Sequence, residues 1–232
     1  MGTSLISRNI QQWQKASDFN LFIVSGYKEG RLKDLGYPLI TNPIFNKSNM
    51  VWSLLMALPK IEKLHDKFVY VSYGDIVLAA KNVQLLIDSS ADMSVVVDLN
   101  WELLWSLRME NYMTDVESLK FSGTTITEIG QSAQSKLDVQ GQYIGVLKIR
   151  RELLISQLRS YKTWVYEDVT ETSILDRQNL YLTDFIQQYI DKSGEVTAVF
   201  INGGWLEVDS VSDLMAYEAN WVENSFFSDI VD

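Results

Sequence analysis

The sequence has 232 residues, 47% of them hydrophobic, which is enough for one sizeable core and too little for two comfortable domains. The absence of cysteine excludes a disulfide framework, a thiolate metal site and a catalytic thiol. The formal net charge of -10, with no stripe of Lys or Arg interleaved with aromatic residues, argues against nucleic acid as a partner.

Nothing in the sequence indicates a membrane or a secreted protein. A membrane-spanning helix needs about 20 apolar residues, and no apolar run of the sequence is that long. The first residues lack the basic start, apolar stretch and cleavage site of a secretory signal. Because no repeat, low-complexity tract or linker is visible either, we expect a single cytoplasmic domain over residues 1–232.

The predicted elements of the first half alternate between helix and strand. A helix capped by Thr3 or Ser4 precedes an apolar run at 21–24 that indicates a strand. The alternation continues with a strand near 38–40, a helix at about 49–58, a strand from Phe68 and a helix over 76–87. This order predicts a parallel sheet.

The second half extends the same sheet and adds one hairpin. Residues 93–97 are fully apolar, which is typical of a strand covered by helices on both faces. Residues 117–129 instead indicate an antiparallel hairpin that turns at Ser122 and Gly123. A strand at 143–149, a helix carrying Leu153 and Tyr161, a helix over 180–190, a strand at 197–201 and a helix over 210–221 follow. The whole predicts an α/β fold, a three-layer αβα sandwich whose mostly parallel, Rossmann-like central sheet carries a local antiparallel hairpin.

The first candidate for chemistry is Asp75. Ligands of such folds bind beyond the carboxyl ends of the strands, and Asp75 ends the apolar run from Phe68, next to the permissive Gly74. It is placed to hold a metal-bound phosphate. It is equally placed to cap the helix expected over 76–87, and spacing does not separate the two interpretations.

A second carboxylate lies in the segment GGWLEVDS, where Glu207 and Asp209 fall on one strand face. Two carboxylates from separate strand ends can share one Mg²⁺, and we predict the pair Asp75 and Asp209. The alternative for this segment is a helix start in which Ser210 and Asp213 form a capping-box pair.

Two further features are weaker candidates. The single histidine, His65, lies between charged neighbours without the partners that a metal or triad role requires, so we expect it at the surface. A group of large side chains could hold an ammonium ion by cation–π attraction or could pack in the core: Trp101, Trp105, Tyr112 and Met113.

Four stretches taken together resemble a known family. They are SNMVWSLLMA at 48–57, VSYGDIVL at 71–78 with VVVDLNWELLWSLRMEN at 95–111, DVESLKF through QGQYIGVLKI at 115–149, and NGGWLEVDSVSDLMAYE at 202–218. Their order and spacing are similar to those of the nucleotidylyltransferases that act on phosphocholine or 2-aminoethylphosphonate, within the sugar-phosphate nucleotidylyltransferase superfamily.

The resemblance implies a site and a reaction. Asp75 and Asp209 would hold the catalytic Mg²⁺, and Asn49 and Ser53 would line the nucleotide side together with Gly74. The acceptor, a small phosphorylated amino alcohol or a phosphonate, would be faced by Asp98, Arg108, Asp115 and Glu117, with Gln142, Tyr143 and Trp205 closing the pocket. An acceptor oxygen would attack the α-phosphorus of CTP and release pyrophosphate, by positioning and charge neutralisation.

Two departures from the family pattern bear on activity. Members begin with a strand and a Gly-rich loop that hold the triphosphate, whereas this sequence begins at a segment similar to the family's first helix. Relatives carry a lysine after the glycine of EIGQSAQ, where this sequence has the neutral Gln131 and Ser132. Both departures favour the alternative of a catalytically degenerate binding or regulatory module. A missing first strand would also leave a sheet edge open for a partner or, as a homo-oligomer, a second copy.

Overall fold

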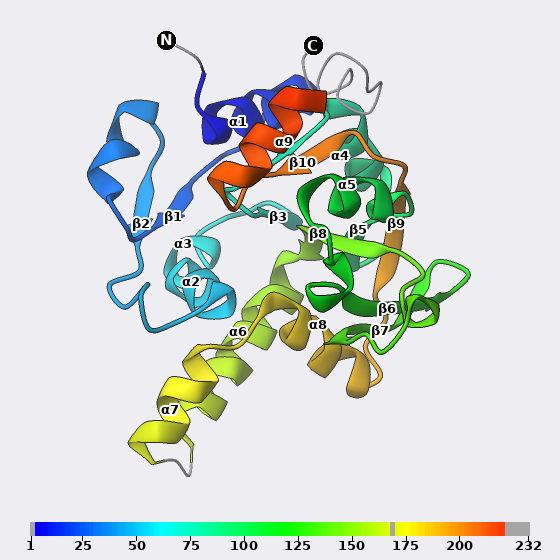
Figure 1. Cartoon of the computed structure of the whole chain (residues 1–232). Coiled ribbons are helices and arrows are strands. Elements are labelled where there is room, and N and C mark those ends of the chain that lie inside the picture. The colour runs from blue at the N-terminus through cyan, green and yellow to red at the C-terminus, as the bar shows by residue number, and fades with distance from the viewer. Residues whose placement is uncertain (1–2, 168–169, 221–232) are drawn as a thin grey trace. The chain divides into compact units, whose positions relative to one another are not determined.

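The computed structural model describes residues 3–167 and 170–220 (Figure 1). Contacts divide the chain into two compact units. Unit 1 comprises Met1–Phe19, Tyr70–Lys148 and Ile190–Asp232, and unit 2 comprises Asn20–Val69 and Ile149–Tyr189. In the described part of the chain, no helix is long and apolar enough to span a membrane.

Unit 1 is built on a six-stranded mixed sheet with the strand order β3-β8-β5-β9-β7-β6. β5 (Met93–Asp98) and β9 (Thr197–Ile201) run parallel, whereas β6 (Glu117–Ser122) and β7 (Thr125–Ser132) form an antiparallel hairpin. The other two strands are β3 (Phe68–Ser72) and β8 (Gln142–Arg150). Every residue of β5 is buried, as its apolar run predicts. The α/β class and the local hairpin expected from the sequence are therefore confirmed.

A second, two-stranded sheet in unit 1 corrects one prediction. β4 (Ile76–Leu78) pairs antiparallel with β10 (Trp205–Glu207), so the predicted helix over 76–87 is wrong at its start. Helix α4 begins later and spans Ala80–Asp88. All three residues of β4 are fully buried. A short apolar run of this kind occurs in buried strands and in buried helices, so periodicity alone does not distinguish the two.

Of the remaining helices of unit 1, the first and the last were predicted from the sequence, and those between them were not. α1 (Leu5–Ala16) is capped by Ser4, whose side chain accepts a hydrogen bond from the Ser7 N–H at 3.3 Å. The others are α5 (Trp101–Arg108), the 3₁₀ turns η3 (Tyr112–Thr114) and η4 (Lys136–Asp138), and α9 (Val211–Asn220). Trp221, the last residue predicted for α9, lies outside the described residues. Trp101, Trp105 and Trp205 are buried in the hydrophobic core of this unit, so packing is their first role.

Unit 2 combines a small parallel sheet with helices. β1 (Ile23–Ser25) pairs with β2 (Leu39–Thr41), and the 3₁₀ turns η1 (Glu29–Arg31) and η2 (Lys33–Leu35) connect the two strands. The helices are α2 (Met50–Met56), α3 (Leu58–Ile61), α6 (Arg151–Tyr166), α7 (Glu171–Gln178) and most of α8 (Leu182–Asp191). The hydroxyl of Tyr161 donates to the Arg177 carbonyl at 2.8 Å and fastens α6 to α7. His65 is exposed, as predicted.

Candidate active site

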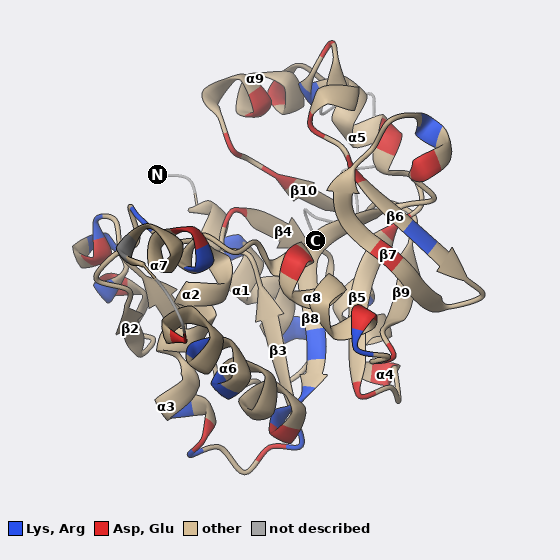
Figure 2. Cartoon of the chain, turned by 90° about the horizontal axis from the view of Figure 1, so that it is seen from below, with Lys and Arg blue, Asp and Glu red and all other residues tan. Residues whose placement is uncertain are grey.

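Asp75 and Asp209 lie at the same end of the β4–β10 pair. Ile76 is opposite Glu207, and the Val208 N–H donates to the Asp75 carbonyl at 3.0 Å. Asp75 therefore precedes a strand rather than a helix, which removes its interpretation as a helix cap. Gly74 beside it is exposed, and a side chain there would meet no atom within 4 Å. Figure 2 shows acidic residues along the segment from β10 into α9.

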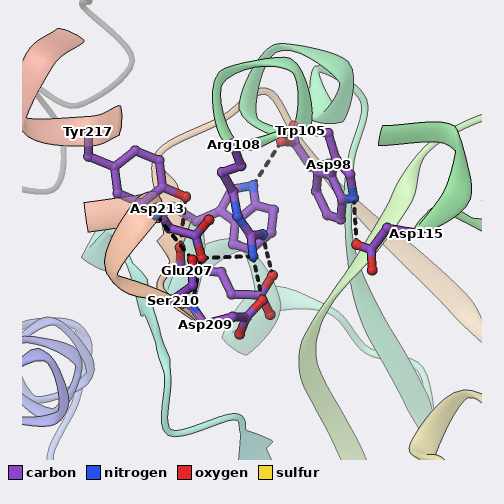
Figure 3. A network of polar contacts seen from close by, with 10 residues as sticks. Asp98, Trp105, Arg108, Asp115, Glu207, Asp209, Ser210, Asp213 and Tyr217 are labelled. Atoms are coloured by element: carbon purple, nitrogen blue, oxygen red, sulfur yellow. Dashed lines mark hydrogen bonds and ion pairs between the residues drawn. The ribbon is translucent and has the colours of Figure 1, made fainter. Parts of the chain in front are cut away.

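One guanidinium group forms ion pairs with three carboxylates of the segment from β10 into α9 (Figure 3). Arg108, the last residue of α5, donates from Nη1 to Oε2 of Glu207 at 2.6 Å. Its Nη2 donates to Oδ2 of Asp209 and, at 3.4 Å, to Oδ2 of Asp213. The Arg108 side chain is 3% exposed and its guanidinium lies 5.9 Å from the Trp105 ring, so it is held in place by packing as well as by charge.

The carboxylates of this cluster differ in burial and in pKa. Burial and the charge of Asp209 raise the pKa of Glu207 to about 7, although the ion pair with Arg108 opposes the shift. Partial burial and the charge of Asp209 also raise the pKa of Asp75, again against Arg108. The Asp209 side chain is 52% exposed, compared with 20% for Glu207 and 6% for Asp213. Asp209 is thus the member most open to solvent and to a ligand.

The start of α9 confirms the capping-box interpretation of the same segment. Oδ2 of Asp213 accepts hydrogen bonds from the N–H groups of Asp209 and Ser210, each at 2.9 Å, and the Ser210 hydroxyl accepts from the Asp213 N–H at 3.2 Å. The hydroxyl of Tyr217 donates to the Glu207 carbonyl at 2.7 Å. Capping and ligand binding are therefore compatible here, because the cap uses Asp213 and leaves the Asp209 carboxylate outside it.

Asp98 is a fully buried support and not a surface group. Its Oδ1 accepts from the N–H groups of Asn100 and Gly203, each at 2.9 Å, and its Oδ2 accepts from the Trp205 indole at 2.8 Å. The carboxylate thus joins the end of β5 to the turn before β10. The role implied by the resemblance, contact with the acceptor, is not what this geometry provides, because three donors already surround the carboxylate.

The other residues expected around the acceptor form a second group in unit 1. Asp115 is exposed and accepts from the Trp105 indole at 3.3 Å. The buried Gln142 donates to the Glu117 carbonyl at 2.6 Å. The hydroxyl oxygen of Tyr143 is buried and has no hydrogen-bond partner among the described residues. A buried polar atom of this kind is available to a ligand or a water.

Tyr73, which sequence reasoning did not single out, connects the two groups. Its ring packs edge-on against Tyr143, with the ring centres 6.2 Å apart. Burial and then the charges of Glu117, Asp75 and Glu207 raise the pKa of Tyr73. The phenol therefore lies in the field of all three carboxylates. Its only sequence signal was its position at the end of the apolar run before Asp75.

Asn49 and Ser53, expected on the nucleotide side, belong to unit 2. The side-chain Oδ1 of Asn49 accepts from the Met50 N–H at 2.9 Å and caps α2. The Ser53 hydroxyl accepts from the buried Asn42 amide at 3.0 Å, and the same amide donates to Ser48 at 2.9 Å. Both residues thus have local structural roles in the unit that carries them.

The donor set at Asp75 and Asp209 suits a hard divalent ion only in part. Within residues 3–167 and 170–220, no group of three His, Cys, Asp or Glu side chains is arranged to hold a metal ion. Mg²⁺ commonly takes one or two protein carboxylates and completes its shell with water and substrate phosphates. The partly buried Asp75 and the half-exposed Asp209, at the same end of the β4–β10 pair, supply two such carboxylates.

The fold of the chain is shared with solved structures. No family model matches the sequence. The fold is similar to that of the inositol-1-phosphate CTP transferase from T. maritima, with a TM-score of 0.69 and 16% identity over 97% of this chain and 82% of that one. It is also similar to the CTP:phosphocholine cytidylyltransferase from Streptococcus pneumoniae, with a TM-score of 0.63 and 17% identity over 94% of this chain and 85% of that one. These likenesses show the fold, a mixed α/β architecture that the solved CTP transferases share.

The sequence gives the finer assignment. A CTP:phosphoglutamine cytidylyltransferase from Campylobacter jejuni is 33% identical over 223 residues, which cover 90% of this chain and 85% of the relative. The chain therefore belongs to the cytidylyltransferases of the sugar-phosphate nucleotidylyltransferase superfamily, as its motifs predicted.

Proposed function

We propose that the chain transfers a cytidylyl group from CTP to a small phosphorylated acceptor that carries an amino group. The observation that supports this most directly is the position of Asp75 and Asp209 on adjoining strand ends, in a chain that is 33% identical to a CTP-using relative. The location of two carboxylates beside each other at a strand end is typical of a site for metal-bound phosphates.

In this proposal an acceptor oxygen attacks the α-phosphorus of CTP, the bond to the β-phosphate breaks, and pyrophosphate leaves. A divalent ion held by Asp75 and Asp209 would neutralise charge on the phosphate oxygens. The protein contributes by orienting the reactants, so no covalent intermediate with a side chain is required. Arg108 and Asp98 act at a distance, because they hold Asp209 and Trp205 in place.

The charge around Tyr73 supports an acceptor with an amino group. The ring of Tyr73 packs on Tyr143, and burial and then the charge of Glu117 raise the pKa of this phenol. A cationic ammonium group is attracted both to carboxylates and to aromatic faces, and a neutral sugar lacks the positive charge on which both attractions depend. Phosphocholine, 2-aminoethylphosphonate and phosphoglutamine, the last from the name of the Campylobacter jejuni relative, all meet this requirement.

The reaction is tested by pyrophosphate release from CTP and Mg²⁺ with each of these acceptors. We expect Asp75→Asn and Asp209→Asn to lower the rate by about 100-fold or more, the usual scale for loss of charge stabilisation at phosphate. Asp66→Asn is the matched control, because Asp66 is an exposed aspartate of unit 2. Rates of both site variants within fivefold of the wild type would refute the assignment of these two residues.

Acceptor choice is tested with an amine-free control, inositol phosphate. Equal turnover of this control and of the amino acceptors would refute the requirement for an amino group. The second candidate function is a binding module without turnover, which the neutral Gln131 and Ser132 favour, because the family resemblance implies a lysine at this point. Binding of CTP in calorimetry, with no pyrophosphate released from CTP in the presence of any of the acceptors, would establish that candidate instead.

A further inference from the structure

Arg108 is bonded to the carboxylate that the proposed function gives to the metal ion. Its Nη2 donates to two carboxylates, those of Asp209 and Asp213, whereas its Nη1 donates to that of Glu207. These bonds would compete with any cation that approaches Asp209. The three bonds differ in how easily a metal ion could replace Arg108 in them, because the three carboxylates have different surroundings.

Glu207 and Asp213 are held by more than Arg108. Asp213 is almost completely buried and accepts two backbone hydrogen bonds that cap α9. Glu207 is mostly buried, and its backbone is fixed by the β4–β10 pairing and by Tyr217. Asp209 differs in both respects, since it is half exposed and lies just beyond the end of β10. Among the described residues, Arg108 is the side chain that forms a hydrogen bond and ion pair with its carboxylate.

Arg108 itself is poorly placed to move. Its side chain is 3% exposed and packs on Trp105, which in turn packs on Trp205 with ring centres 5.8 Å apart. Two of its three carboxylate partners are also buried. An exchange at this site would therefore move Asp209 and leave the guanidinium where it is.

We propose that Arg108 is an internal counter-cation for Asp209, which holds this carboxylate while no divalent ion is bound and yields it to the ion while keeping Glu207 and Asp213. This inference rests on the proposed function, which places the ion at Asp75 and Asp209. Arg108 is then a positioning residue that keeps the site compact before metal binding, at the expense of metal affinity. A purely structural tie would have the opposite effect, because its loss would loosen the 207–213 segment and weaken metal binding.

The test is Mn²⁺ binding to the full chain without nucleotide, measured by calorimetry for the wild type and Arg108→Lys. Lysine keeps a positive charge near Glu207, but a single ammonium cannot reproduce the two-pronged contact, so Asp209 is released. We expect the Kd for Mn²⁺ to fall by about fivefold, the scale of a partly exposed ion pair. An unchanged or higher Kd, or no Mn²⁺ binding by the variant, would overturn the proposal.

A second measurement uses the native sequence, so that the inference can be tested even if the Arg108→Lys variant does not fold. In protein labelled with ¹⁵N-arginine, Mg²⁺ should shift the Arg108 guanidinium resonances in the wild type and not in Asp209→Asn. Arg159, which pairs with Glu62 in unit 2, is the internal reference and should not shift. Unshifted Arg108 resonances at saturating Mg²⁺ would refute the exchange. Pyrophosphate release is measured separately, so an active enzyme without the exchange contradicts this inference and leaves the proposed function intact.

Discussion

Asp98 offers the clearest test of how the site is supported. Its carboxylate is fully buried and accepts three hydrogen bonds, from two backbone N–H groups and the Trp205 indole, at 2.8 to 2.9 Å. In Asp98→Ala these three donors lose their acceptor inside the protein. Each buried donor left without a partner costs about 1–3 kcal/mol. Since some of this cost is recovered by relaxation or an entering water, we expect a loss of about 3–6 kcal/mol in the free energy of unfolding.

The assay is urea unfolding followed by tryptophan fluorescence, with the midpoint and slope compared between variants. Asp115→Ala is the matched control, because Asp115 also accepts from a tryptophan indole but is exposed and makes a longer bond of 3.3 Å. We expect the control to lose less than about 1 kcal/mol. If Asp98→Ala were within about 1 kcal/mol of the wild type, the view of Asp98 as the support of the β10 turn would be wrong.

Two further substitutions test the packing around the candidate site. Gly145→Ala should lower the free energy of unfolding by about 2 kcal/mol or more, because Gly145 has φ +78° and an added Cβ would lie 2.3 Å from the Tyr73 ring. Gly30→Ala is its control, since a Cβ there meets no atom within 4 Å, and equal melting temperatures of the two variants would contradict the contact. Tyr217→Phe should lose about 1 kcal/mol in urea unfolding, because the buried hydroxyl donates to the Glu207 carbonyl at 2.7 Å, and no change would show that this bond contributes nothing.

The sequence predicted the order of elements well wherever the signal was local. The apolar run at 93–97 became a buried strand, and the turn residues Ser122 and Gly123 marked the hairpin that forms. Ser4 and Ser210 were recognised as helix caps because capping depends on neighbours within a few residues. The prediction failed at Ile76–Leu78, where a three-residue apolar segment is a strand only because Trp205–Glu207 pairs with it.

The carboxylates of the candidate site were proposed from the sequence, but their environments could not be predicted from it. The pair Asp75 and Asp209 was predicted from strand ends and carboxylate chemistry. The structure brings both residues to one end of the β4–β10 pair, which the sequence did not predict. The burial of Asp98, the contact of Arg108 with Glu207 and Asp209, and the position of Tyr73 depend on segments far apart in the chain. Periodicity and spacing report which residues share a face of one element, whereas the side chains that meet across elements are decided by tertiary packing.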